Sequence, residues 1–219
     1  MKKVILKLTK SVNHSDLRNL SMINTIDLNQ KSISQIKIFV NRKESTVGNF
    51  FSIKISKIKS KTNEIEIHGC NKFFNYLGYR WKKDKLFINS DLGFNIGYKM
   101  ISGEIKINGS VDNFLGAEMS GGEIYVKGNA GNFVGSSYLG VKQGMKGGEI
   151  IIDGHAEDYL GCFMRRGLIV VKGKVGKFCC FKITFIISNK CCSIRWINTT
   201  STSFYKIYCV LFINFFTIW

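Results

Sequence analysis

The sequence contains no proline, only three histidines and no long apolar run. His14, His68 and His155 show no His-x3-His spacing, and the cysteines show no Cys-x2-Cys spacing. Such spacings are typical of metal sites, and an active site normally needs clustered acid–base or nucleophilic groups. The adjacent acids Glu157 and Asp158 are interpreted as a solvated turn. These absences argue against a metal site or a catalytic centre on this chain.

Membrane and export signals are also missing. The apolar run in Met1–Lys7 stops after three residues, whereas a signal peptide needs about 7–15. Phe204–Trp219 is interrupted by Lys206 and Asn214 and is shorter than the ~20 residues of a membrane span. We therefore expect a cytoplasmic protein with reduced thiols and no membrane partner. Two cysteines, Cys70 and Cys162, are expected as ordinary small core or turn residues.

Basic residues outnumber acidic ones by 32 to 15, which gives a formal net charge of +17. The excess lies at both ends: residues 1–63 hold 13 basic and 3 acidic side chains, residues 64–176 hold 14 and 12, and residues 177–219 hold 5 and none. Such an excess can indicate nucleic-acid binding. Because the middle of the chain is nearly balanced and carries no groove-reading helix motif, we predict no nucleic-acid partner.

A repeat of about 19 residues runs through the middle of the chain. Six segments have aliphatic residues at their second and fourth positions: Glu64–Ile67, Lys85–Ile88, Glu104–Ile107, Glu123–Val126, Glu149–Ile152 and Leu168–Val171. Their starts are 21, 19, 19, 26 and 19 residues apart. This alternation predicts short strands with one face turned inward, and the fixed period predicts a stack of repeats.

Glycine and methionine recur at fixed places in these repeats. Of the 22 glycines, 21 lie between residues 64 and 176. Glycine adopts positive φ, so we interpret the clusters as corners rather than as phosphate-binding loops, which need a following helix. A methionine stands four residues before four strands, at Met100, Met119, Met145 and Met164. A soft side chain at one height of successive repeats predicts a core ladder. The predicted fold class is all-β, a parallel β-helix (solenoid) of ~19-residue glycine-rich coils.

Residues 64–176 resemble the C-type subunit of formylmethanofuran dehydrogenase and of its bacterial relative, the formyltransferase/hydrolase complex. The resemblance is most specific at Gly140–Gly154, a longer coil with the turn Gly-Met-Lys-Gly-Gly, and at Met164-Arg-Arg-Gly167. Asn41–Phe51 resembles the family's lead-in to its first strand. The wider GXGXG β-helix superfamily includes the C-terminal domain of the glutamate synthase large subunit.

The resemblance implies a right-handed parallel β-helix that acts as a non-catalytic scaffolding subunit in one-carbon metabolism and methylotrophy. It implies formyltransferase-like and amidohydrolase-like partner subunits and a methanofuran-type carrier whose formyl group is released as formate. Metals, and molybdopterin or tungstopterin in archaeal-type oxidoreductase complexes, are expected on the partner subunits. No catalytic residue, metal site or cofactor is therefore expected on this chain. Two alternatives stay open: a detached glutamate-synthase-type GXGXG domain, and a free-standing β-helix binding module.

The 26-residue repeat predicts one candidate binding site. Its seven additional residues bring Lys142 and Lys146 out of the regular coil, and Arg165 and Arg166 occupy the corresponding corner of the next coil. Corners of successive coils lie about 4.8 Å apart. These four residues are therefore predicted to form a basic patch for an acidic carrier arm or an acidic partner face. The alternative is that they are ordinary solvated turn residues.

The chain divides into three parts on this pattern. Residues 1–63 form a basic lead-in, with a short helix expected at Asp16–Leu20 and strands at Ile36–Val40 and Phe51–Ile58. Residues 64–176 form the GXGXG-type β-helix. Residues 177–219 lack glycine, acid and the repeat, and we interpret them as the product of a reading-frame shift near residue 178. The alternative is a genuine extension that caps the coil.

Overall fold

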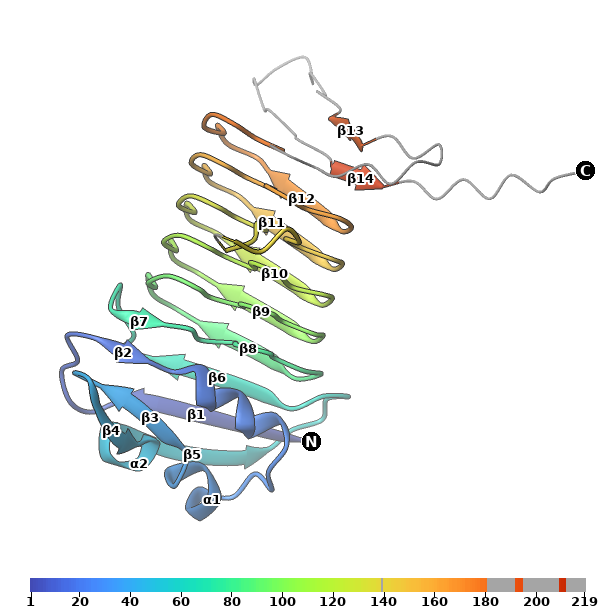
Figure 1. The fold of residues 1–219 in the computed structure, drawn as a ribbon. Coiled ribbons are helices and arrows are strands. Elements are labelled where there is room, and N and C mark those ends of the chain that lie inside the picture. Colours follow the sequence, from blue (N-terminus) through green and yellow to red (C-terminus); the bar gives the residue numbers. More distant parts are fainter. Residues whose placement is uncertain (139, 181–191, 195–208, 212–219) are drawn as a thin grey trace, which may run out of the picture.

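The computed structural model describes residues 1–138, 140–180, 192–194 and 209–211, and their arrangement is a stack of short strands with a mixed N-terminal region at one end (Figure 1). The elements are β1 (Lys2–Leu8), β2 (Ser15–Asp16), the 3-10 helix η1 (Arg18–Asn24), α1 (Gln30–Ser34), β3 (Lys37–Val40), β4 (Lys43–Thr46), α2 (Val47–Phe50), β5 (Phe51–Lys57), β6 (Glu64–His68), β7 (Phe74–Asn75), β8 (Lys85–Ile88), β9 (Glu104–Ile107), β10 (Glu123–Val126), β11 (Glu149–Ile152), β12 (Leu168–Val171), β13 (Cys192–Ile194) and β14 (Cys209–Leu211).

All six strands expected from the repeat are confirmed, and they pair with one another in parallel. They are neighbours in one eight-stranded sheet with the order β12-β11-β10-β9-β8-β6-β1-β5. The register places Ile124 of β10 opposite Ile105 of β9 and Ile150 of β11. Equivalent residues of successive repeats therefore lie directly above one another, including across the repeat that is seven residues longer.

The inward positions of these strands form the core. Ile105, Ile124, Ile150 and Ile169 are all 1% exposed or less. A second inward column follows the first corner, where isolated parallel bridges join Leu92, Val111, Ala130, Ala156 and Val175. Burial of these aliphatic columns supplies the hydrophobic stabilisation of the stack.

The predicted methionine ladder is confirmed. Met100, Met119 and Met145 are fully buried, and each packs against a glycine of the next repeat. A Cβ atom at Gly122 would lie 2.6 Å from Met100 Cε, and one at Gly148 would lie 2.6 Å from Met119 Cε. Both glycines also have positive φ, at 89° and 92°. Glycine is therefore required there by space as well as by backbone conformation.

The prediction of an all-β, right-handed parallel β-helix was wrong. The eight-stranded sheet is mixed, because β5 runs antiparallel to β1 while β1 runs parallel to β6. A second sheet, in the order β4-β3-β2-β7, also mixes antiparallel and parallel pairs. Three short helices, η1, α1 and α2, accompany these sheets. The arrangement is α/β-like, because residues 1–63 lie outside the repeat and contribute antiparallel strands and helices of their own.

The N-terminal region is joined to the repeats through buried polar contacts. Asn24 at the end of η1 donates from Nδ2 to Asp84 Oδ2 at 3.0 Å, and Asn63 Nδ2 donates to Asp84 Oδ1 at 3.2 Å. Asn24 and Asp84 are 6% and 2% exposed. Buried polar groups need such partners, so these contacts fix η1 against the repeats. The expected helix at Asp16–Leu20 begins two residues later, at Arg18, and is a 3-10 helix.

Two further strands expected in this region are confirmed, at β3 and β5, whereas β1 was missed because its residues were considered only as a leader.

Most of residues 177–219, on which the frame-shift interpretation rests, lies outside the described residues. Within the described ranges, no helix combines the length and apolar composition that a bilayer crossing requires.

The central column makes a direct prediction about stability. Replacing Ile124, which is 1% exposed, with alanine is expected to lower the free energy of unfolding by about 2–5 kcal/mol, because the change leaves a cavity between two stacked repeats. Replacing the exposed Lys127 with alanine should change it by less than about 0.5 kcal/mol. Urea unfolding of both variants measures the difference, and equal midpoints would contradict the assignment of Ile124 to the core.

Candidate functional site

An aromatic column runs along one corner of the repeats. It consists of four rings at equivalent positions, Phe114, Phe133, Tyr159 and Phe178. Successive centroids are 4.9, 4.9 and 5.0 Å apart, with interplanar angles of 8°, 9° and 17°. These spacings match the distance between neighbouring strands, so the stacking is imposed by the register of the repeats.

The backbone under this column is left-handed. Phe114, Phe133, Tyr159 and Phe178 have φ values of 64°, 62°, 61° and 56°. Such values are uncommon for residues with a bulky side chain and are strained. The strain recurs in every repeat, and ring stacking contributes about 0.5–1.5 kcal/mol per aromatic pair to offset it. The recurrence identifies the column as part of the architecture rather than as an isolated strained site.

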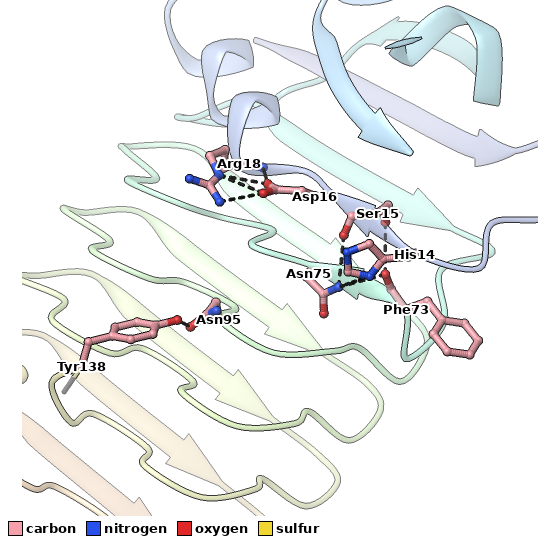
Figure 2. Close-up of polar contacts among 8 residues, drawn as sticks. All are labelled: His14, Ser15, Asp16, Arg18, Phe73, Asn75, Asn95 and Tyr138. Atoms are coloured by element: carbon pink, nitrogen blue, oxygen red, sulfur yellow. Dashed lines mark hydrogen bonds and ion pairs between the residues drawn. The ribbon is translucent and has the colours of Figure 1, made fainter. Parts of the chain in front are cut away.

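Asn95 interrupts the column, and the longest repeat supplies the missing ring. Asn95 shares the left-handed conformation, with φ of 63°, which asparagine tolerates better than most residues. The Tyr138 ring comes from the inserted loop and stacks on Phe114 at 4.5 Å and 4°. Its hydroxyl donates to Asn95 Oδ1 (Figure 2). Tyr138 therefore occupies the level of the column at which Asn95 has no ring.

Burial raises the pKa of the Tyr138 hydroxyl, and the neighbouring Tyr76 and Tyr98 act in the same direction. Asn95 itself is 1% exposed. Tyr98 makes an edge-to-face contact with Tyr138, with centroids 5.1 Å apart. The hydrogen bond thus lies in an apolar, aromatic environment, where an unpaired amide oxygen would be costly.

Cationic side chains border the N-terminal end of these rings. The Arg18 guanidinium lies 4.3 Å from the Tyr76 ring centroid and is held by Asp16, with Arg18 Nη2 donating to Oδ2 at 2.7 Å. Lys99 Nζ lies 5.0 Å from the Tyr98 centroid and 3.5 Å from Glu118 Oε2. Both cations are thus paired with a carboxylate as well as with a ring.

The N-terminal strand β2 meets the repeats beside these residues. Asn75 Nδ2 donates to the Ser15 carbonyl at 3.2 Å and lies 3.4 Å from His14 Nδ1 (Figure 2). Asn75 Oδ1 accepts from the Phe94 N–H at 3.0 Å. Asn75 is 2% exposed, and its amide connects three segments of backbone. This cluster stabilises the junction and contains no nucleophile with an adjacent base.

The polar residues that might have been read as catalytic bind backbone instead. His155 Nδ1 accepts from the Lys174 N–H at 2.7 Å, and Asp158 Oδ1 accepts from the Lys177 N–H at 2.6 Å. Asn132 makes the same kind of contact one repeat earlier, accepting from the Asp158 N–H at 3.0 Å. Each side chain thus satisfies a backbone donor of the next repeat, which gives these residues a structural role.

Burial raises the pKa of the Cys70 thiol to about 12, so this cysteine is not an activated nucleophile. Cys70 and Cys162 are 7% and 4% exposed, so of the two expected settings, core or turn, both residues are buried. Within residues 1–138, 140–180 and the two short strands beyond them, no group of three or more His, Cys, Asp or Glu side chains is placed to hold a metal ion.

The four residues of the predicted basic patch come from two adjoining repeats. The Met145 carbonyl, next to Lys146, accepts from the Arg165 and Arg166 N–H groups at 2.8 and 3.3 Å. Lys142, Lys146 and Arg166 are exposed, whereas Arg165 is half-buried. Arg165 Nε is buried without a hydrogen-bond partner in the described part of the chain. The backbones of Lys146, Arg165 and Arg166 are therefore close, and Arg165 differs from the other three residues of the patch in being partly packed.

Comparison with known proteins identifies a related assembly. No family model and no curated protein matches the chain. Among solved structures, it is similar to a chain of the X-ray crystal structure of the formyltransferase/hydrolase complex (FhcABCD) from Methylorubrum extorquens in complex with methylofuran, with 26% sequence identity and a TM-score of 0.69. The chain is related to that complex. The match covers 80% of this chain and 64% of that chain.

Sequence reasoning missed Tyr138 and its contact with Asn95. Replacing Tyr138 with phenylalanine is expected to lower the free energy of unfolding by about 1–3 kcal/mol, because Asn95 Oδ1 loses its donor while buried. The matched control is Tyr159→Phe in the same column, where the hydroxyl has no partner among the described residues, and this change should be nearly neutral. Equal losses in chemical denaturation would contradict the role of the hydrogen bond.

The raised pKa of Tyr138 also predicts a dependence of stability on pH. The unfolded tyrosine releases its proton near pH 10, whereas the folded one retains it because burial raises its pKa. Its contribution is complete below about pH 10 and is lost as the pH rises toward the folded-state pKa. The unfolding free energy of the wild type should therefore fall more steeply above about pH 10 than that of Tyr138→Phe. Parallel curves would contradict the raised pKa.

Proposed function

We propose that this chain is the non-catalytic, C-type scaffolding subunit of a formyltransferase/hydrolase complex in one-carbon metabolism. The observation that carries the proposal is its structural similarity to a chain of the FhcABCD complex. His155 and Asp158 each accept a hydrogen bond from a backbone N–H group, which also supports a structural rather than a chemical role.

The partners follow from the same proposal. In it, formyltransferase-like and amidohydrolase-like subunits carry the reaction, with metals on those subunits, and a methanofuran-type carrier delivers the formyl group. The similar complex was crystallised with methylofuran, which supports a carrier of this class. The stack of parallel repeats offers a long side surface against which such subunits can be held at fixed spacing.

Co-expression with the formyltransferase-like and amidohydrolase-like proteins of the same genome tests the proposal. The chain is expected to co-elute with both in size-exclusion chromatography, and the assembly should release formate from a formylated carrier. The purified chain alone should release none, since in this proposal the partner subunits carry the reaction. Turnover by the chain alone, or elution of the chain apart from both proteins, would refute the scaffolding role.

Within this proposal, the basic patch contacts an acidic carrier arm or an acidic partner face. Lys142, Lys146 and Arg166 are exposed, and none of them forms an ion pair within the described ranges. Charges at the rim of an interface mainly set the association rate and its salt dependence. Arg166 is a better probe of this contact than Arg165, because the Arg165 side chain is partly packed.

A charge-reversed Lys142→Glu/Arg166→Glu variant is expected to bind its partners several-fold more slowly at low salt, with a weaker salt dependence and an unchanged melting temperature. Lys127→Glu/Lys174→Glu changes the same charge at two other exposed positions and should leave binding unaltered. Surface plasmon resonance at several salt concentrations measures both. An unchanged association rate for the Lys142→Glu/Arg166→Glu variant would show that the patch is ordinary surface charge.

A further inference from the structure

Strand β5 is the last strand of the eight-stranded sheet, and its outer edge is unpaired. The sheet order ends at β5, whose only strand neighbour among the described elements is β1. Thr9 N–H donates to the Phe50 carbonyl, and Ile58 N–H donates to the Met1 carbonyl. Antiparallel ladders alternate between bonded and non-bonded pairs, so the even-numbered residues from Phe50 to Ile58 face β1. The odd-numbered residues direct their backbone groups away from it.

Most of the outward backbone groups have no partner. Phe51, which caps the C-terminal end of α2, donates its N–H to the carbonyl of Val47, the first residue of that helix. The N–H and carbonyl groups of Ile53 and Ile55 take part in no hydrogen bond found within the described part of the chain. The side chains of both isoleucines pack partly against the core, which holds this stretch of β5 in an extended conformation. A row of free donors and acceptors on a fixed strand is a template for another strand.

A groove lies beside this edge. It is lined by Lys31 and Ser34 of α1, Gly48 of α2, and Ile53 and Lys54 of β5, among others, and none of its lining residues is acidic. α1 lies next to β5 at the end of the stack (Figure 1). A groove between an edge strand and a helix can accept an extended peptide, which hydrogen-bonds to the strand and contacts the helix with its side chains.

Charge indicates what this groove can bind. Lys31 and Lys54 are both exposed, and neither forms an ion pair with the described residues. A second copy of β5 would bring its own Lys54 and Lys57 toward the same lysines, which like-charge repulsion disfavours. An acidic segment instead complements them.

We propose that the groove between β5 and α1 binds an extended, acidic segment of a partner protein, which adds to the sheet as a further strand beside β5. The free backbone groups of Ile53 and Ile55 supply the hydrogen bonds, and Lys31 and Lys54 select acidic side chains. The inference rests on the edge and its charge, and it holds whether or not the chain belongs to a formyltransferase/hydrolase complex.

The test measures binding of a peptide to the full chain by isothermal titration calorimetry. The peptide has eight residues of alternating glutamate and valine, and its ends are acetylated and amidated. We expect saturable binding, and binding at least about tenfold weaker for a lysine–valine peptide of the same length. A glutamate–valine peptide with alternate amides N-methylated cannot pair along one edge and should also lose at least about tenfold.

Variants of the chain locate the site. Lys31→Glu/Lys54→Glu should weaken binding of the acidic peptide at least about tenfold, whereas Lys127→Glu/Lys174→Glu should leave it unchanged. Ile55→Pro removes one outward N–H without removing a bond to β1, as proline is tolerated on edge strands, and it should weaken binding at an unaltered melting temperature. If this variant unfolds, amide exchange of the wild type replaces it, with slower exchange at Ile53 and Ile55 on addition of peptide.

The outcomes separate cleanly. Loss of binding with the Lys31 and Lys54 changes, together with slower exchange at Ile53 and Ile55, supports the inference. Absence of saturable binding to the wild type at about millimolar peptide, or equal binding of the N-methylated peptide, overturns it. Neither outcome depends on co-elution with formyltransferase-like or amidohydrolase-like proteins, so the proposed function can fail while this inference stands.

Discussion

The parallel register between successive repeats is the constraint on which the rest of the structure depends. Ile105, Ile124 and Ile150 lie opposite one another, and a slip by one residue would turn each inward side chain to the surface. The same register stacks the methionines against glycines and the aromatic rings on one another. It also explains why the seven additional residues of one repeat leave the stack as a loop, because the strands on either side of them keep the same pairing.

Tyr138 attaches that loop to the stack through its contacts with Phe114 and Asn95. The left-handed corner residues are strained, and the strain is offset where rings lie at the spacing of the strands. At Asn95 the column has no ring of its own, and Tyr138 supplies both the ring and a donor for the buried amide. The insertion is thereby anchored at one end by the aromatic column. Its basic residues, Lys142 and Lys146, are presented from an anchored segment rather than from a free loop.

The parts of the fold that could be predicted are those that repeat. The six strands, the isoleucine core and the methionine ladder follow from spacing alone, because burial with period two and a period of about 19 are visible in the sequence. The overall fold class could not be predicted from them, because β1 pairs with β5 and β6 through contacts distant in sequence. The contact of Tyr138 could not be predicted for the same reason, because its partner Asn95 is 43 positions away in the sequence. The polar residue in an otherwise apolar column was the only sign of that contact.

The same register limits where such a chain can bind anything. Inside the stack, side chains are used by neighbouring repeats: His155 and Asp158 accept backbone N–H groups, and Asp153 pairs with Lys172 at 2.6 Å. Unpaired backbone groups and exposed cations also occur where the repetition stops, at the outer edge of β5 and at the inserted loop. Both places carry lysines that are not neutralised by described acids, while the repeats between them are nearly balanced in charge. Both contacts proposed for this chain therefore lie at interruptions of its pattern, and the exposed lysines at each favour an acidic partner.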